Sequence, residues 1–291
     1  MNGPRLPRAG RGPAGGGRGS SARTGRGPAA GAGRLAFPAA LWLALAVALT
    51  FLTLPVVSVF VDAGPGELVD SLGDGESLDA LRLSLETSAV AVALVIAVGT
   101  PAAYLLATRS FRGKALVTTL VELPLVLPPA AAGIGLLAAL GPNGVLGGAL
   151  DDAGIRLVLE TAGVVVALAF VSAPFYVRQA QAAFEAVDRP LLEASRTLGR
   201  GEAATFARVA VPVARPGLAA GTALALGRAL GEFGATLMFA GSVRGVTQTA
   251  PLAIFERFGS DFDAALALSA VLVAVSLAVL LTVKLALRAD A

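Results

Sequence analysis

The sequence predicts an all-α polytopic membrane protein with six transmembrane helices. Among its 291 residues, 55% are hydrophobic and only 15% are charged, whereas soluble domains carry about 25% charged residues. Six apolar segments reach or approach the roughly 20 residues that a helix needs to cross a bilayer. Basic residues are concentrated in alternate connections between these segments, as expected of a chain that crosses a membrane several times.

The N-terminal segment differs in composition from the rest of the chain. Residues 1–34 contain seven Arg and no acidic residue, and we expect them to form a disordered cytoplasmic tail that either attracts an anionic leaflet or is simply solvated. The apolar run that follows far exceeds the roughly 7 to 15 residues of a signal-peptide core, so we expect a retained span. Residues 35–291 then form the membrane domain, with spans at about 35–61, 83–108, 115–140, 157–177, 217–240 and 264–283.

Three prolines interrupt the third predicted span, namely Pro124, Pro128 and Pro129. Each removes a backbone hydrogen bond, which a membrane helix tolerates where neighbouring helices or cavity water satisfy the freed groups. They therefore predict a kink, either beside a gate or as a plain packing feature. Mixed segments such as 83–108 also fit buried helices of a soluble all-α protein, but six such runs in one chain disfavour that alternative.

The distribution of charge predicts the orientation of the chain. Eighteen of the 23 basic residues fall in the tail, the connection after the second span, the segment 178–215 and the C-terminus. By the positive-inside rule, both termini and the segment 178–215 are cytoplasmic. The opposite side collects the acidic residues Asp62, Glu67, Asp70, Asp74, Glu76, Asp79, Asp151, Asp152, Glu256, Asp261 and Asp263.

Residue usage argues against catalysis by this chain. It contains no Cys and no His, which excludes disulfides, thiolate metal sites and a histidine base. An intramembrane enzyme would have to use Asp151 and Asp152 as a metal-binding pair or Ser172 as a nucleophile, and neither has partners at suitable spacing. Gly113-Lys114 lacks the flanking residues of a phosphate-binding loop, so we expect no cofactor and no ATP site in this chain.

A polar hairpin separates the fourth and fifth predicted spans. Asp188 is expected to cap a short helix with Pro190 in its first turn, and Gly199 to end that helix in the left-handed conformation. A second short helix is expected from about Gly201 until Pro212 breaks it.

The first of these short helices has two different faces. Leu191, Ala194 and Leu198 share one face, whereas Glu193 and Arg196 lie away from it. Such a helix suits attachment to a groove in a cytoplasmic protein, and a solvated or interfacial loop is the alternative.

The spacing within the hairpin resembles the EAA loop of ATP-binding-cassette importer permeases. That pattern is EAA, three residues, Gly, nine residues, then I-x-L-P. This chain departs from it at Ser195, Val209 and Val211. The resemblance implies the type I importer permease fold, with the hairpin coupling the chain to a separate ATPase that uses ATP and Mg²⁺. The residues it marks for ATPase docking are Glu193, Ala194, Ser195, Gly199, Val209 and Pro212.

Two polar groups near the fifth span are candidates for the translocation path. The first group is Arg228 and Glu232, near the middle of the predicted span, with Thr236 one turn further on. The two charged residues either line an aqueous path or form an ion pair that fastens helices. The second group, Thr247, Gln248 and Thr249, offers neutral donors suited to an oxyanion or simply forms a polar outer turn.

Several segments resemble the molybdate permeases of this importer class, with sulfate and tungstate permeases as close relatives. They include LPLVLPP, GPNGVLG, APFYVRQAQAAFEAVD, RALGEFGATLMFAG and TQTAPLAIF, and the resemblance covers about residues 83–287. It implies ATP-driven import of molybdate across a bacterial inner membrane. The implied partners are the ATPase, an extracytoplasmic oxyanion-binding protein, a second permease copy forming a homodimer, and membrane lipid, without nucleic acid. Sulfate or tungstate import is the alternative, and a passive channel is a more distant one.

Overall fold

A computed structural model describes residues 29–64, 66, 68 and 73–289, and in that part of the chain all regular structure is helical. The predicted all-α fold is therefore confirmed. The helices are α1 (Ala29–Asp62), α3 (Gly75–Thr108), α4 (Lys114–Val126), α5 (Pro129–Leu140), α6 (Gly147–Asp152), α7 (Thr161–Glu185), α8 (Arg189–Thr197), α9 (Glu202–Thr205), a π-helical turn (Phe206–Ala210), α10 (Val211–Leu230), α11 (Gly234–Ala240), α12 (Ala250–Phe258) and α13 (Phe262–Ala289).

Five of the described helices are long and apolar enough to cross a membrane. A bent pair, α4 with α5, brings the number to six if the pair is one span. The unbroken candidates are Phe37–Asp62, Gly75–Thr108, Thr161–Glu185, Glu202–Leu230 and Phe262–Val283. This agrees with the predicted six spans, although several boundaries differ.

The chain divides into two units, Met1–Thr53 and Leu54–Ala291. In the first unit, the predicted tail lies largely outside the described residues. The helix α1 nevertheless begins at Ala29, earlier than the predicted start of the span at Leu35. Residues 29–34 are rich in alanine, which favours a helix. The helix therefore begins inside a segment that we expected to be disordered because of its Gly and Arg content.

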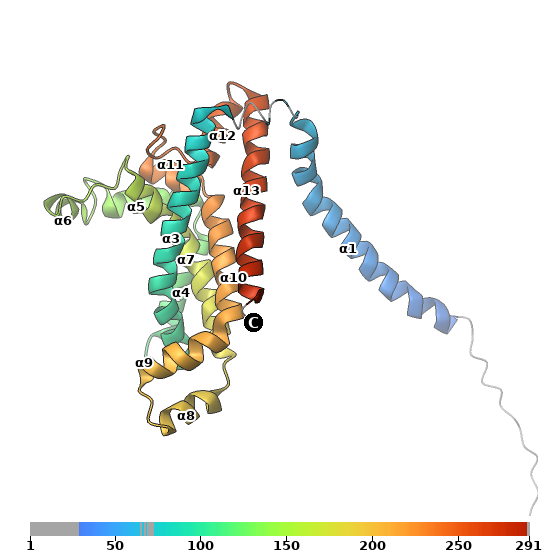
Figure 1. Ribbon diagram of the computed structural model, residues 1–291, viewed down its shortest axis with the longest axis vertical. Coiled ribbons are helices and arrows are strands. Elements are labelled where there is room, and N and C mark those ends of the chain that lie inside the picture. The colour runs from blue at the N-terminus through green and yellow to red at the C-terminus, as the bar shows by residue number, and fades with distance from the viewer. Residues whose placement is uncertain (1–28, 65, 67, 69–72, 290–291) are drawn as a thin grey trace, which may run out of the picture. The chain divides into compact units, whose positions relative to one another are not determined.

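A bundle of α3, α7, α10 and α13 forms the centre of the second unit (Figure 1). The helix α7 packs against both α3 and α10, and α13 packs against α10. Small residues permit the close approach: a Cβ added to Gly217 would lie 2.3 Å from the Cβ of Ala183. Tyr176 and Leu168 on α7 are almost fully buried between these helices. The bundle therefore combines membrane-type small-residue contacts with a packed interior.

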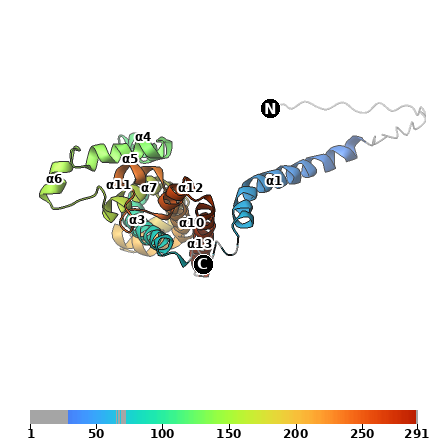
Figure 2. The same ribbon diagram turned by 90° about the horizontal axis from the view of Figure 1, so that it is seen from above.

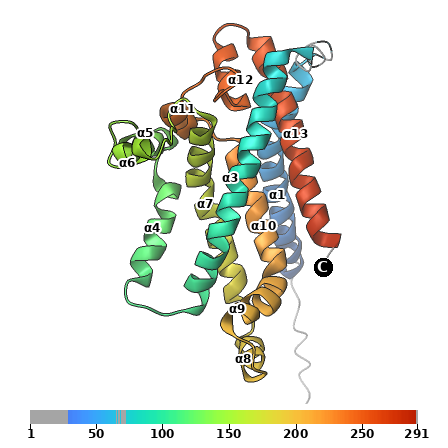
Figure 3. The ribbon, with the colours of Figure 1, turned by 60° about the vertical axis from the view of Figure 1, so that its left-hand side comes forward.

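The third predicted span, 115–140, is not one straight helix. It breaks between α4 and α5, whose axes differ in direction by 117°. Pro128 has no N–H to continue the hydrogen-bond ladder and is followed by Pro129 at the first turn of α5. Figure 3 shows α4 alongside the bundle and α5 turning away at its upper end. Figure 2 shows α5 and α6 extending to one side.

The fifth predicted span, 217–240, also differs in the structure. One helical run extends from Glu202 to Leu230 and α11 is a separate short helix beyond a break at residues 231–233. The expectation that Pro212 ends the preceding helix is wrong. A π-helical turn comes first, in which Val211 N–H bonds to Phe206 O, and Pro212 then lies in the first turn of α10. The helical run does not end at Pro212, because Ala210 and Val211 before it both keep right-handed helical backbone angles.

The remaining spans are longer than their apolar cores. The helix α3 covers 75–108 rather than the predicted 83–108. The helix α7 covers 161–185 rather than 157–177, and α13 covers 262–289 rather than 264–283. The start of α3 illustrates the cause: the carboxylate of Asp74 accepts hydrogen bonds from the backbone N–H groups of Glu76 and Ser77, at 3.3 and 3.2 Å. Such a cap starts a helix in polar sequence that hydropathy does not mark.

Candidate functional site

The predicted hairpin lies at one end of the bundle, where α8 and α9 connect α7 to the long helical run ending in α10 (Figure 1). Pro190 stands in the first turn of α8, and Gly199 adopts φ +82° just beyond its end, as predicted. Asp188 occupies the cap position, but its side chain makes no capping hydrogen bond. The helix is therefore started by Pro190 and stopped by Gly199.

The helix α8 exposes the predicted apolar stripe. Leu191 is 46% exposed, Leu198 is 81% exposed, and Ala194 between them is also exposed. Glu193 is exposed on the other side of the helix, and its side chain makes no hydrogen bond or ion pair with any described residue. A contiguous apolar stripe on an otherwise polar helix is typical of a protein-binding surface.

The rest of α8 is anchored to the hairpin. Ser195 is buried, and its Oγ lies 2.9 Å from Oγ1 of Thr205 in α9. Leu192 is buried in the main apolar core, against which Val209 of the π-helical turn also packs. Pro212, partly buried, follows that turn. Of the hairpin residues that the motif marks, Ser195 and Val209 thus hold the hairpin together while Glu193 and Ala194 remain exposed.

The structure brings Arg228 and Glu232 together as an ion pair. The side chain of Glu232 is only 1% exposed, and its Oε1 also accepts a hydrogen bond of 2.7 Å from the backbone N–H of Ala235. Glu232 lies in the break between α10 and α11 and therefore satisfies a free donor at the start of α11. Thr236 is fully buried, and its hydroxyl has no hydrogen-bond partner among the described residues.

The outer segment Thr247, Gln248 and Thr249 is buried rather than exposed. The hydroxyl of Thr247 accepts a hydrogen bond of 2.8 Å from the backbone N–H of Val243, and Gln248 donates to Glu256. Thr249 immediately precedes α12, and its hydroxyl has no hydrogen-bond partner among the described residues. Thr247 thus stabilises the turn itself, whereas Gln248 joins the turn to α12.

The polar group around Glu232 and the segment 247–249 lie on neighbouring elements. The ring of Phe233, beside Glu232, contacts the ring of Phe255 in α12 at a centroid distance of 4.9 Å. The N-terminus of α12 is held to the bundle by a hydrogen bond of 2.7 Å from Ala250 N–H to Ser84 Oγ on α3. Among the described residues, no hydrogen bond or ion pair joins Glu232 or Thr236 directly to residues 247–249.

A charge network lies at the same end as α12 and joins it to the start of α3. Arg244 pairs with Glu76 and Glu256, each at 2.6 Å, and Arg257 pairs with Asp74. The hydrogen bond from Arg257, aided by Ser77, lowers the pKa of Asp74 to about 2. The contribution of this pair to stability is therefore present above an ordinary carboxyl pKa and is lost as the pH falls toward 2.

The candidate residues for an intramembrane enzyme are not assembled into a site. The hydroxyl of Ser172 is buried and donates to the carbonyl of Leu168 at 2.6 Å. Asp151 and Asp152 are exposed on α6. In the part of the chain that the structure describes, no group of three or more Asp, Glu, His or Cys is placed to hold a metal ion.

Residues 99–289 match the family model of the binding-protein-dependent transport system inner membrane component, which spans more than half of the chain. The chain belongs to this family. It is a membrane-spanning transporter subunit rather than an enzyme, and its fold is that of the type I importer permeases.

Two relatives and one solved structure illustrate the similarity of this permease to known proteins. It is 39% identical to the molybdenum transport system permease protein ModB of Mycobacterium tuberculosis. The aligned 235 residues cover 81% of this chain and 89% of that protein. It is 35% identical to the sulfate transport system permease protein CysW of Synechococcus elongatus, over 70% of this chain and 73% of that protein. A bacterial ABC transporter that imports the acidic polysaccharide alginate has a chain with the same fold, at a TM-score of 0.71 and 19% identity, covering 87% of this permease and 95% of that chain.

Sequence reasoning missed the contacts that fasten the permease hairpin to the bundle. Tyr104, Phe184 and Phe206 form an aromatic cluster with centroid distances of 4.8 to 6.1 Å, joining α3, α7 and the π-helical turn. Arg109 at the end of α3 pairs with Glu202 of α9. The sequence places an aromatic residue near each of three helix ends. These residues are far apart along the chain, so local spacing does not predict that their rings are in contact.

Proposed function

We propose that this permease is the membrane subunit of an ATP-driven importer for molybdate. The observation that carries the proposal is the 39% identity to a molybdenum permease over most of both chains, combined with an exposed apolar stripe on α8. The sulfate permease at 35% identity supports sulfate as the alternative cargo, with tungstate as a further oxyanion of the same class.

Energy enters through α8 in this proposal. Leu191, Ala194 and Leu198 insert into a groove of a separate ATPase subunit, which binds ATP and Mg²⁺, while this chain binds no cofactor. Gly199 sets the end of the helix, and the Ser195–Thr205 contact fixes α8 on α9. Because α9 continues through the π-helical turn into α10, a movement of α8 is transmitted to a membrane-spanning helix.

The proposed orientation places α8 in the cytoplasm. Arginine is concentrated at this end in 178–215, and the C-terminal end of α13 lies at the same end of the bundle (Figure 1). With α4 and α5 counted as one broken span, six crossings return both termini to the cytoplasm.

The translocation path is proposed to run beside Arg228, Glu232 and Thr236, between two copies of this chain. Arg228 is neutralised by Glu232, and the buried hydroxyls of Thr236 and Thr249 have no hydrogen-bond partner among the described residues. A path of neutral donors binds an oxyanion weakly enough to release it. At the outer end, Arg244 and Arg257 are already paired with carboxylates, which favours capture of the anion by a separate extracytoplasmic binding protein.

Uptake of radiolabelled molybdate tests the cargo. Cells that lack this chain and cells in which it is restored are compared, with tungstate and sulfate as competitors. Restored uptake that tungstate blocks and excess sulfate leaves unchanged is the expected result. Sulfate uptake without molybdate uptake would keep the permease architecture and assign the chain to the sulfate relatives, whereas uptake independent of any ATPase would indicate a passive channel.

A further inference from the structure

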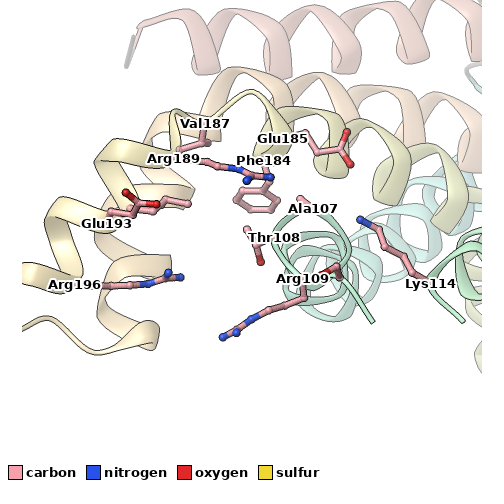
Figure 4. A pocket seen from close by; sticks show the side chains of 12 residues that line it. Ala107, Thr108, Arg109, Lys114, Phe184, Glu185, Val187, Arg189, Glu193 and Arg196 are labelled. Atoms are coloured by element: carbon pink, nitrogen blue, oxygen red, sulfur yellow. The ribbon is translucent and has the colours of Figure 1, made fainter. Parts of the chain in front are cut away.

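A basic pocket of about 510 Å³ lies beside α8, and of the residues that the motif marks for ATPase docking only Glu193 lines it. Side chains reach it from the ends of α3 and α7, the start of α4, and α8 (Figure 4). The charged side chains that line it are Arg109, Lys114, Glu185, Arg189, Glu193 and Arg196. Four are basic and two are acidic, so the pocket carries an excess of positive charge.

Two of the four cations in the pocket are free. Arg109 pairs with Glu202, and Arg196 lies 4.0 Å from the same carboxylate. The side chains of Lys114 and Arg189 make no hydrogen bond or ion pair with any described residue. A compact ammonium and a planar guanidinium without partners, facing one cavity, form a favourable site for a phosphate group.

The geometry of α8 keeps this pocket separate from the apolar stripe. Arg189, Leu192, Glu193 and Arg196 line the pocket and are spaced as one face of a helix. At about 100° per residue, this face is centred opposite the stripe of residues 191, 194 and 198. A protein that covers the stripe, and reaches Glu193 at its edge, therefore leaves Arg189 uncovered on the opposite face of α8.

A separate apolar groove of about 440 Å³ lies further along the same three helices, α3, α4 and α7. On α3 the groove ends at Ala102 and the pocket begins at Ala107, and on α4 the pocket contains Lys114 while the groove begins at Leu120. At about 1.5 Å per helical residue, the groove and the pocket are separated by roughly 8 to 9 Å. The groove is lined among others by Val98, Val121, Phe170 and Val177.

We propose that an anionic phospholipid occupies both sites, with its phosphate between Lys114 and Arg189 and an acyl chain in the groove. Basic pockets between membrane helices on the cytoplasmic side are suited to anionic headgroups. A free phosphate would use the pocket and leave the groove empty, and an apolar helix of a second permease copy would fill the groove without supplying an anion. The lipid braces α8 against α3 and α4 from the side opposite the ATPase. The cytoplasmic placement of α8 is taken from the proposed function.

Native mass spectrometry of the purified full-length permease tests this site. The protein is titrated with phosphatidylglycerol and, separately, with phosphatidylcholine carrying the same acyl chains. We expect phosphatidylglycerol to bind preferentially, and the variant Lys114→Gln/Arg189→Gln to weaken that binding about tenfold. The matched control Arg200→Gln/Arg208→Gln removes two exposed arginines near α8 that lie outside the pocket, and it should bind as the wild type does.

A third variant and a competitor identify the occupant. Ala102→Phe fills the groove and should also weaken phosphatidylglycerol binding, whereas millimolar inorganic phosphate should not displace the lipid. Equal binding of the two lipids, an unchanged affinity in the pocket variant, or displacement by phosphate would overturn the proposal. So would an unaffected Ala102→Phe variant. Because binding is measured without transport, the result is independent of whether the chain carries molybdate.

Discussion

Gly199 shows how one residue sets the geometry of the hairpin. Its φ of +82° is a left-handed conformation that side-chain-bearing residues rarely adopt, and a Cβ added there would meet nothing within 4 Å. Backbone conformation is therefore the reason for glycine at this position, rather than lack of space. Gly201, two residues later, has a φ of −66° and is equally unobstructed.

This difference gives a matched pair of substitutions. Gly199→Ala should strain the end of α8 by about 1 kcal/mol, whereas Gly201→Ala should be nearly neutral. We expect Gly199→Ala to reduce co-purification of the ATPase subunit and molybdate uptake, while Gly201→Ala retains both at equal expression. Equal behaviour of the two variants would show that the end of α8 tolerates the change and does not set its docking geometry.

At the scale of elements, the helix ends at residues 230–234 depend on Glu232. This side chain pairs with Arg228 of α10 and accepts a hydrogen bond from Ala235 of α11, so it joins two helices across a break. The break itself was not predicted, because the GEFG segment lies within a continuous apolar run. The ion pair was one of two alternatives that the spacing of Arg228 and Glu232 left open, and the structure forms it.

Substitutions at Glu232 separate its two contacts. Glu232→Gln keeps an oxygen that can accept from Ala235 N–H but loses the ion pair, whereas Glu232→Ala loses both and leaves Arg228 without its buried partner. We expect Glu232→Ala to destabilise the purified permease by about 3 to 5 kcal/mol and Glu232→Gln by less. Thermal unfolding in detergent measures the order. Equal stability of Glu232→Ala and the wild type would remove Glu232 from the joint between α10 and α11.

At the scale of the whole molecule, much of the architecture could be predicted from hydropathy and charge. The six apolar segments, the helix α8 and the stop at Gly199 depend on local sequence, which is why they were found. The kink between α4 and α5 was predicted from Pro124, Pro128 and Pro129, but its angle of 117° was not. That angle and the early end of α10 depend on how the chain packs within the bundle, so local sequence did not reveal them. The aromatic cluster of Tyr104, Phe184 and Phe206 is a long-range contact, and local patterns carry no information about such contacts.

The proposed six-crossing topology can be tested directly because the chain contains no cysteine. Arg200→Cys places a thiol beyond α8, and Ser260→Cys places one between α12 and α13, both at exposed positions. A membrane-impermeant maleimide applied to intact spheroplasts should label only the second variant, and both after permeabilisation. Labelling of Arg200→Cys in intact spheroplasts would reverse the proposed orientation.

The most direct test of the central claim is ATP-dependent molybdate uptake into proteoliposomes containing this permease, its ATPase and its binding protein. Leu198→Ser alters a side chain that is 81% exposed and therefore should leave the fold intact. Thr197→Ala, an exposed neighbour outside the apolar stripe, is the control. We expect Leu198→Ser to lose most ATPase binding and uptake and Thr197→Ala to retain both. Normal uptake by Leu198→Ser would contradict the entry of energy through the exposed stripe of α8.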